Sequence, residues 1–95
     1  MTDARREAAE TLALRALGWM AGNEPVLMAF LAASGAAPED LRARALEPGF
    51  LGSVLDFLLT DDAWVMAFCD AAGLRYEQPM QAAMVLGGAR HRHWT

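Results

Sequence analysis

The chain contains no lysine, no isoleucine and a single cysteine, and only two of its 95 residues are histidine. One thiol, Cys69, cannot form an internal disulfide and cannot build a cysteine-based zinc site alone. Residues branched at Cβ are scarce, with four valines and four threonines against 20 alanines. Because alanine is the best helix former and β-branched residues favour strands, the composition predicts an all-α fold without a sheet.

Long apolar runs are also missing. The longest uninterrupted apolar segment, VLMAFLAA, spans residues 26–33 and is far too short to cross a bilayer. The first ten residues, MTDARREAAE, are charged where a signal peptide needs an apolar run. These two features predict a cytoplasmic protein without a membrane partner.

The charge is negative, with a net value of −4 at pH 7, and all eight basic residues are arginine. Non-specific affinity for nucleic acid depends on clusters of basic residues, and an acidic surface repels phosphates. The balance of charge therefore argues against free nucleic acid as the main partner.

Helical periodicity and capping residues divide the chain into six predicted helices. Apolar positions at helical spacing predict a first amphipathic helix over residues 3–21, with a core face of Ala9, Leu12, Ala13, Ala16, Leu17 and Met20. Caps, prolines and closing glycines place the other helices at about residues 24–34, 38–46, 48–59, 62–72 and 78–86. The second helix is apolar nearly all round and is expected to be central, with Asn23 accepting hydrogen bonds as its cap. The fourth is expected to be mostly buried.

These elements predict a compact bundle of five to six helices in a single helical domain, residues 1–88. The last segment, residues 89–95 (ARHRHWT), follows two glycines and is expected to be a flexible C-terminal tail.

A shift of 38 positions lays residues 12–45 on residues 50–83 and aligns eight identical pairs, including Phe30 with Phe68 and Gly35 with Gly73. The same shift places Trp19 on Phe57. This pattern predicts two tandem helical units that pack together because neither alone can bury its apolar face. The alternative is that any short helix in an alanine-rich bundle needs a cap, a phenylalanine and a closing glycine.

Three segments, LALRALGW, PEDLRARA and FLGSVLDFLLTDDAWVMAFCDAAGL, resemble a family of small all-helical alphaproteobacterial proteins of unknown function. The resemblance covers roughly residues 8–88 and implies an all-helical fold, but it transfers no catalytic residue because the family has no established activity. It also points towards signalling, since such proteins are often encoded near response regulators. The chain departs from the family at its end, where Leu86-Gly87-Gly88 stands in place of Leu-Pro-Gly-Gly.

Residues that suggest chemistry have simpler interpretations. Cys69 has no neighbouring base and reads as a structural thiol. Asp61 and Asp62 suit a helix cap better than a calcium loop, which needs more oxygen ligands at fixed spacing. His91 and His93 lie in the predicted tail and form at most a loose, adventitious metal site. We therefore predict a protein that is not an enzyme, with no catalytic, cofactor-binding or metal-binding residues and no cofactor.

The remaining interpretation is a helical protein-interaction module, an adaptor or regulator that binds another protein or itself. The methionines at positions 20, 28, 66, 80 and 84 either line an adaptable groove or belong to the core, and the core is favoured. The candidate partner contacts are Arg42, Arg44, Arg90, Arg92 and Trp94.

An alternative is a helix-turn-helix-like DNA-binding accessory protein, in which residues 24–46 form the motif and Arg42 and Arg44 lie on its second helix. Recognition helices contact DNA chiefly through their N-terminal residues, which here are Glu39 and Asp40. Those carboxylates would face repulsion by phosphates, so the protein-binding interpretation is preferred.

Overall fold

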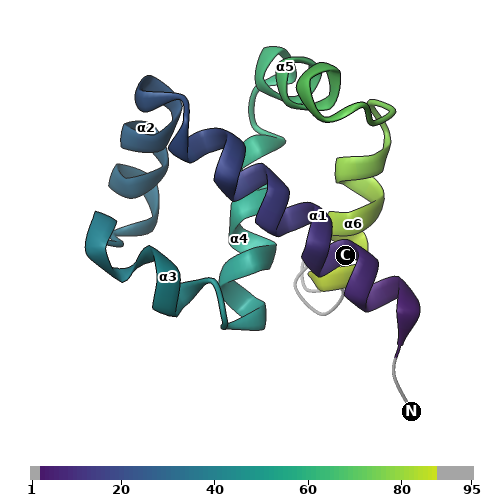
Figure 1. The fold of residues 1–95 in the computed structure, drawn as a ribbon, viewed down its shortest axis with the longest axis horizontal. Helices are drawn as coiled ribbons and strands as arrows, with labels where there is room; N and C mark the ends of the chain where they lie inside the picture. The colour runs from purple at the N-terminus through teal and green to yellow at the C-terminus, as the bar shows by residue number, and fades with distance from the viewer. Residues whose placement is uncertain (1–2, 88–95) are drawn as a thin grey trace, which may run out of the picture.

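A computed structural model describes residues 3–87 and shows six α-helices and no strand in this part of the chain (Figure 1). The elements in order are α1 (Ala4–Ala21), α2 (Glu24–Ser34), a 3₁₀ turn η1 (Pro38–Asp40), α3 (Leu41–Arg44), α4 (Pro48–Leu58), α5 (Asp62–Ala72) and α6 (Gln78–Leu86). The predicted all-α bundle is confirmed. The predicted tail, residues 89–95, lies outside the described residues.

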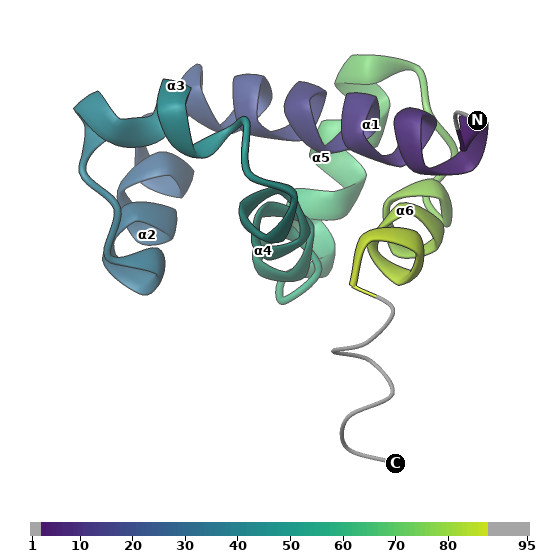
Figure 2. The same ribbon diagram turned by 90° about the horizontal axis from the view of Figure 1, so that it is seen from below.

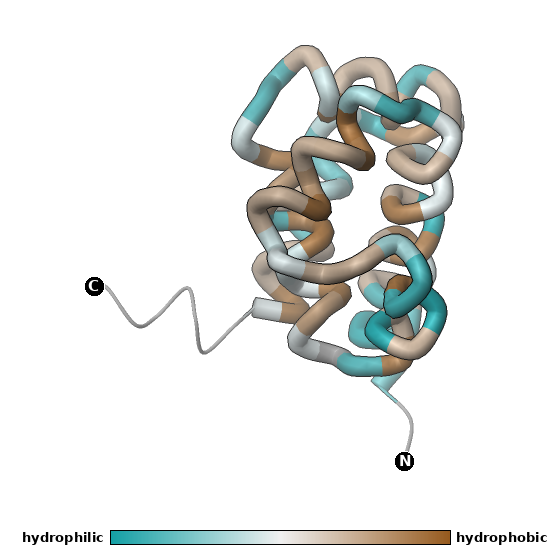
Figure 3. Tube along the Cα trace, turned by 90° about the vertical axis from the view of Figure 1, so that its left-hand side faces the viewer, coloured by the Kyte–Doolittle hydropathy of each residue, from teal (hydrophilic) through white to brown (hydrophobic). Residues whose placement is uncertain are grey.

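Helix α1 extends across the molecule, and α2, α4 and α6 lie along one side of it (Figure 2). All six residues predicted for its core face are buried. Along the tube in Figure 3, hydrophobic and hydrophilic residues recur in turn through the helices, as they do in amphipathic helices.

Helix α4 is mostly buried, as predicted, and it lies at the centre of the core. It packs against α1, α6 and α2, and the side chains of Val54, Leu55 and Leu58 are fully buried. The prediction that α2 would be central is wrong. Only Val26, Phe30 and Leu31 of α2 are buried, because the helix lies at one end of α1 and its remaining apolar surface consists largely of alanines that tolerate water.

The third helix is shorter than predicted. The expected helix over residues 38–46 is a 3₁₀ turn followed by one turn of α-helix, which ends at Arg44. The backbone then tightens, with the Glu47 amide donating to the Arg44 carbonyl, before Pro48 begins α4. Helix α4 ends at Leu58, one residue earlier than expected.

The two central caps differ from each other. Asp61 accepts a hydrogen bond from the Ala63 amide at 2.8 Å, as its position before α5 predicts. Asn23 precedes α2 but its side chain caps no amide, so its predicted hydrogen bonds are absent.

The 38-residue correspondence holds in space for the first two helices of each unit. Helices α2 and α5 have the same length in the same register, and the glycines that close them, Gly35 and Gly73, have left-handed φ angles of 75° and 72°. Equivalent positions on α1 and α4 are buried together, namely Leu12, Ala13, Ala16, Leu17 and Met20 with Phe50, Leu51, Val54, Leu55 and Leu58.

Aromatic contacts show how the two units pack. Phe30 of α2 meets Phe57 of α4 with ring centroids 5.4 Å apart and an interplanar angle of 62°. The equivalent pair, Phe68 of α5 and Trp19 of α1, lies at 6.0 Å and 57°. Each unit therefore inserts its phenylalanine against the aromatic ring of the other unit. The correspondence fails in the third segment, since α6 packs against both α1 and α4 whereas α3 does not.

Candidate functional site

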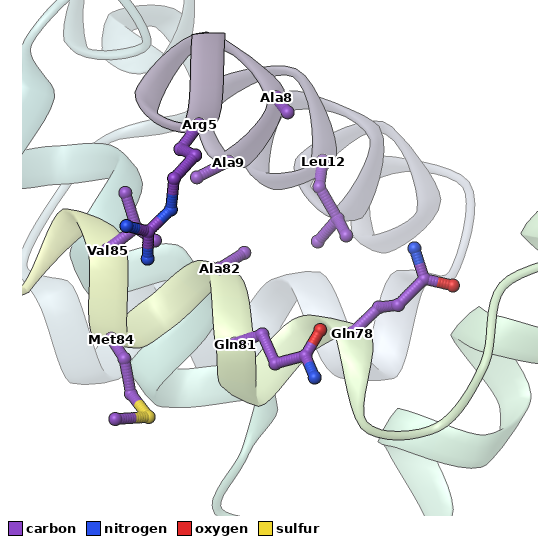
Figure 4. A pocket seen from close by; sticks show the side chains of 9 residues that line it. All are labelled: Arg5, Ala8, Ala9, Leu12, Gln78, Gln81, Ala82, Met84 and Val85. Atoms are coloured by element: carbon purple, nitrogen blue, oxygen red, sulfur yellow. The ribbon is translucent and has the colours of Figure 1, made fainter. Parts of the chain in front are cut away.

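A hollow of about 660 Å³, the α1–α6 groove, lies between α1 and α6. Its floor is formed by Ala9, Leu12 and Ala82, which are nearly fully buried. Small alanines line part of the approach between the two helices, and the longer side chains of Arg5 and Leu12 extend from α1 towards α6 (Figure 4).

The rim of the α1–α6 groove is mixed in character. Arg5 extends from α1 towards α6, and the amides of Gln78 and Gln81 stand along α6 (Figure 4). Met84 completes the rim and is 59% exposed. An apolar floor with a few polar groups around it is the usual composition of a binding site.

The second hollow is the α2–α4 pocket, of about 420 Å³. Three phenylalanines form its wall, with Phe30 in edge-to-face contact with Phe50 at 5.6 Å and with Phe57 at 5.4 Å. Polar groups from both helices and from the segment between them complete the lining: Ser34, Arg44, Glu47 and Ser53.

The structure places one of the five predicted partner contacts at a hollow. Arg44 lines the α2–α4 pocket with its guanidinium carbon 6.0 Å from the centre of the Phe50 ring. Arg42 is exposed on α3 and lines neither hollow. Arg90, Arg92 and Trp94 lie outside the described residues.

A family model for proteins of unknown function, DUF3572, matches residues 6–89. The chain belongs to the DUF3572 family. This confirms the family of unknown function that the sequence resembles, while the alphaproteobacterial origin stays an expectation. No curated protein and no solved structure matches the chain.

The thiol of this DUF3572 protein is buried in α5. Cys69 Sγ lies 3.4 Å from the Arg75 carbonyl oxygen. Burial raises the pKa of Cys69 from its ordinary value of 9.0, and the negative charges of Asp70 and Glu77 raise it further. The side chain is therefore a protonated thiol at neutral pH, which agrees with a structural role and opposes nucleophilic chemistry.

Tyr76 and Asp70 form a polar contact near this thiol. The Tyr76 hydroxyl donates to Asp70 Oδ1 at 2.8 Å, and this hydrogen bond raises the pKa of Tyr76. Both side chains are exposed, so the contact fastens the loop after α5 to the helix.

Within residues 3–87, no group of three or more histidine, cysteine or acidic residues could hold a metal ion. In the same part of the chain, none of the helices combines the length and apolarity needed to cross a bilayer. The favoured core interpretation of the methionines is confirmed for Met20 and wrong for the other four, which are exposed: Met28, Met66, Met80 and Met84. Met84 lines the α1–α6 groove.

The role of Arg15 was not predicted from the sequence. Its guanidinium donates to the Ala72 carbonyl at 2.8 Å, which joins α1 to the C-terminal end of α5. A cation at this position also complements the negative end of the α5 dipole. The sequence does carry a signal for this role. The 38-residue shift aligns Arg15 of the first unit with Ser53 of the second, which has a much shorter side chain.

Proposed function

We propose that this DUF3572 protein is a non-enzymatic protein-interaction module, an adaptor or regulator, and that the α1–α6 groove receives apolar side chains of a partner protein. The supporting observation is the composition of the groove, with a floor of small apolar residues and a rim that carries a guanidinium, two amides and an exposed methionine. Flexible thioethers adapt to a partner, and interface centres are apolar with polar rims.

The wider setting belongs to the same proposal. From the sequence we also propose a role in signalling, a cytoplasmic location and a partner that is either another protein or a second copy of the chain. The buried, protonated Cys69 supports a protein without nucleophilic chemistry of its own.

The geometry of the third segment favours a protein partner over DNA. A helix-turn-helix protein inserts the N-terminal residues of its second helix into the major groove. Here that helix, α3, has only four residues and is preceded by the exposed carboxylates of Glu39 and Asp40.

Affinity capture from the native host lysate tests the proposal, with nuclease present to remove bridging nucleic acid. Ala8→Arg and Met84→Arg place charges in the α1–α6 groove at exposed positions, and Met28→Arg is the matched control on exposed α2 surface. We expect the wild-type chain and Met28→Arg to retain the same partner and both groove variants to lose it. Equal retention by all four proteins would contradict the groove as the site, and capture that disappears with nuclease would favour the DNA-binding alternative.

A further inference from the structure

The first relevant observation is that Arg15 and Ser53 occupy equivalent positions in the two units. Helix α1 packs against α5 as α4 packs against α2, so the end of α5 near Arg15 corresponds to the end of α2 near Ser53. Arg15 donates to the carbonyl of Ala72, the last residue of α5. Ser53 cannot make the equivalent contact, because its hydroxyl donates to Gly49 within its own helix.

The second observation is what this difference leaves at the end of α2. The residue equivalent to Ala72 is Ser34, whose carbonyl accepts no hydrogen bond from any other described residue. Ser34 and Ser53 both line the α2–α4 pocket. The pocket therefore lies at the end of α2, the position equivalent to the end of α5 that Arg15 contacts, and it opens at the negative end of the α2 dipole.

The third observation is the chemistry of the pocket walls. Phe30, Phe50 and Phe57 give the pocket an apolar wall against which the aliphatic stem of an arginine can pack, and Arg44 already lies over the Phe50 ring. Glu47 adds a carboxylate at the pocket. The net charge of −4 attracts a basic segment towards the molecule as a whole.

We propose that the α2–α4 pocket receives an arginine side chain of a partner protein, with its guanidinium donating to the Ser34 carbonyl as Arg15 donates to Ala72. This inference rests on the proposed protein-binding function and names the chemistry of the partner. Planar guanidinium, with its fork of donors and its affinity for aromatic faces, fits these walls better than the ammonium of lysine.

Arg44 makes the proposal sharply testable because it lines the same pocket and opposes a second cation. Removing its charge is expected to strengthen the binding of an arginine side chain. If the pocket instead receives an acidic side chain, Arg44 is its natural partner and its removal abolishes binding. The sign of the effect therefore distinguishes the two occupants.

The test is a titration of the ¹⁵N-labelled full chain with the peptide acetyl-Ala-Arg-Ala-amide, followed by NMR, with the lysine and glutamate versions of the peptide as matched controls. We expect saturable shifts of the Ser34, Gly35 and Ser53 amides with the arginine peptide, weaker shifts with lysine and none with glutamate. In Arg44→Ala the dissociation constant for the arginine peptide should fall about threefold or more. Shifts confined to the glutamate peptide, or weaker arginine binding in Arg44→Ala, would overturn the inference.

A second variant places an arginine of the chain itself in the α2–α4 pocket. Ser53→Arg should reach the Ser34 carbonyl, raise the melting temperature by a few degrees and abolish the shifts caused by the arginine peptide. Unchanged peptide shifts in a folded Ser53→Arg protein would show that the peptide binds elsewhere, which also overturns the inference.

Two further experiments test where the arginine comes from and whether the proposed function itself is correct. If Arg90 or Arg92 of the same chain fills the pocket, the double variant Arg90→Ala/Arg92→Ala will shift the Ser34 and Ser53 amides without any peptide, and the partner source is then wrong. The proposed function fails separately if Ala8→Arg and Met84→Arg leave capture of the partner unchanged, because these residues line the α1–α6 groove and neither lines the α2–α4 pocket.

Discussion

Phe30 and Phe68 are the largest fully buried side chains, each 1% exposed, and each packs against a ring from the other unit. Replacing either by alanine leaves a cavity as well as losing apolar burial, so each change should lower the free energy of unfolding by about 3–5 kcal/mol. The free energy of unfolding of a chain of this length is about 5–14 kcal/mol. The two losses together take up most of this stability, so the double variant should not fold. Urea denaturation monitors the loss.

The control for these variants is Met28→Ala, which lies on the same helix as Phe30 and is 58% exposed. It should change the free energy of unfolding by no more than about 0.5 kcal/mol. A similarly small effect for Phe68→Ala would contradict the exchange of aromatic contacts as a source of stability.

Cys69 links stability to alkaline pH. Its pKa in the folded protein is raised above the ordinary value of 9.0, chiefly by burial and then by Asp70 and Glu77. As the pH rises past 9, the unfolded chain loses the thiol proton first, so the stability contributed by the protonated thiol is present below that pH and is lost as the pH passes through the folded pKa.

We therefore expect the free energy of unfolding in urea to decrease above about pH 9 and to decrease less in Cys69→Ala. Tyr76, whose pKa is also raised, adds a loss of the same sign above about pH 10, and Tyr76→Phe separates the two groups. An identical alkaline decrease in wild type and Cys69→Ala would exclude Cys69 as its source.

At the scale of the helices, two closing glycines fix where α2 and α5 end. Gly35 and Gly73 have positive φ angles and no atom within 4 Å of an added Cβ, so alanine there meets only backbone strain. Each substitution should cost about 1–2 kcal/mol. Gly18→Ala, at an exposed position in the last turn of α1, also meets open space and should stabilise by up to about 1 kcal/mol. Thermal melts of the three variants show whether each substitution raises or lowers the melting temperature. A higher melting temperature for Gly35→Ala would contradict the left-handed conformation that ends α2.

The helix caps provide a matched pair of a different kind. Asp61→Ala removes the hydrogen bond to the Ala63 amide and should cost about 0.5–2 kcal/mol. Asn23→Ala removes a side chain that caps nothing and should cost less. Equal losses in the two variants, measured by urea denaturation, would mean that Asn23 caps α2 in solution.

Most helices were predictable from local signals. The bounds of α2 and the start of α4 follow from Pro48, Gly35 and the run of apolar residues, which act within a few positions of the chain. The burial of α2 was not predictable, because its alanines suit a core or a surface equally and the decision depends on whether a neighbouring helix covers them. The shortened α3 likewise depends on the turns that lead into α4.

The candidate site was largely hidden from the sequence. A groove between α1 and α6 depends on small residues about 70 positions apart, such as Ala9 and Ala82, that meet only after folding. The α2–α4 pocket was within reach, since Arg15 and Ser53 align under the shift and differ greatly in size. The pocket thus follows from a difference between the units, whereas the prediction of two units rested on their identical residues.

For the whole molecule, the exchange of aromatic contacts means that neither unit should fold alone. Phe30 needs Phe57 and Phe68 needs Trp19, and α1 packs more extensively against α4 and α6 of the other unit than against α2 of its own. Fragments 1–46 and 47–95 should each give far-ultraviolet circular dichroism spectra with little helix, and their mixture should gain helix. A cooperative thermal transition in fragment 1–46 alone would contradict this.

The same exchanged contacts determine when the N-terminal half can fold during synthesis on the ribosome. Trp19 is made 49 residues before Phe68, its partner across the molecule. At about 5–20 residues per second, Phe68 is added roughly 2–10 s after Trp19. During this interval the apolar faces of α1 and α2 have no lasting cover, so we expect the nascent N-terminal half to bind chaperones until α4 and α5 have been made.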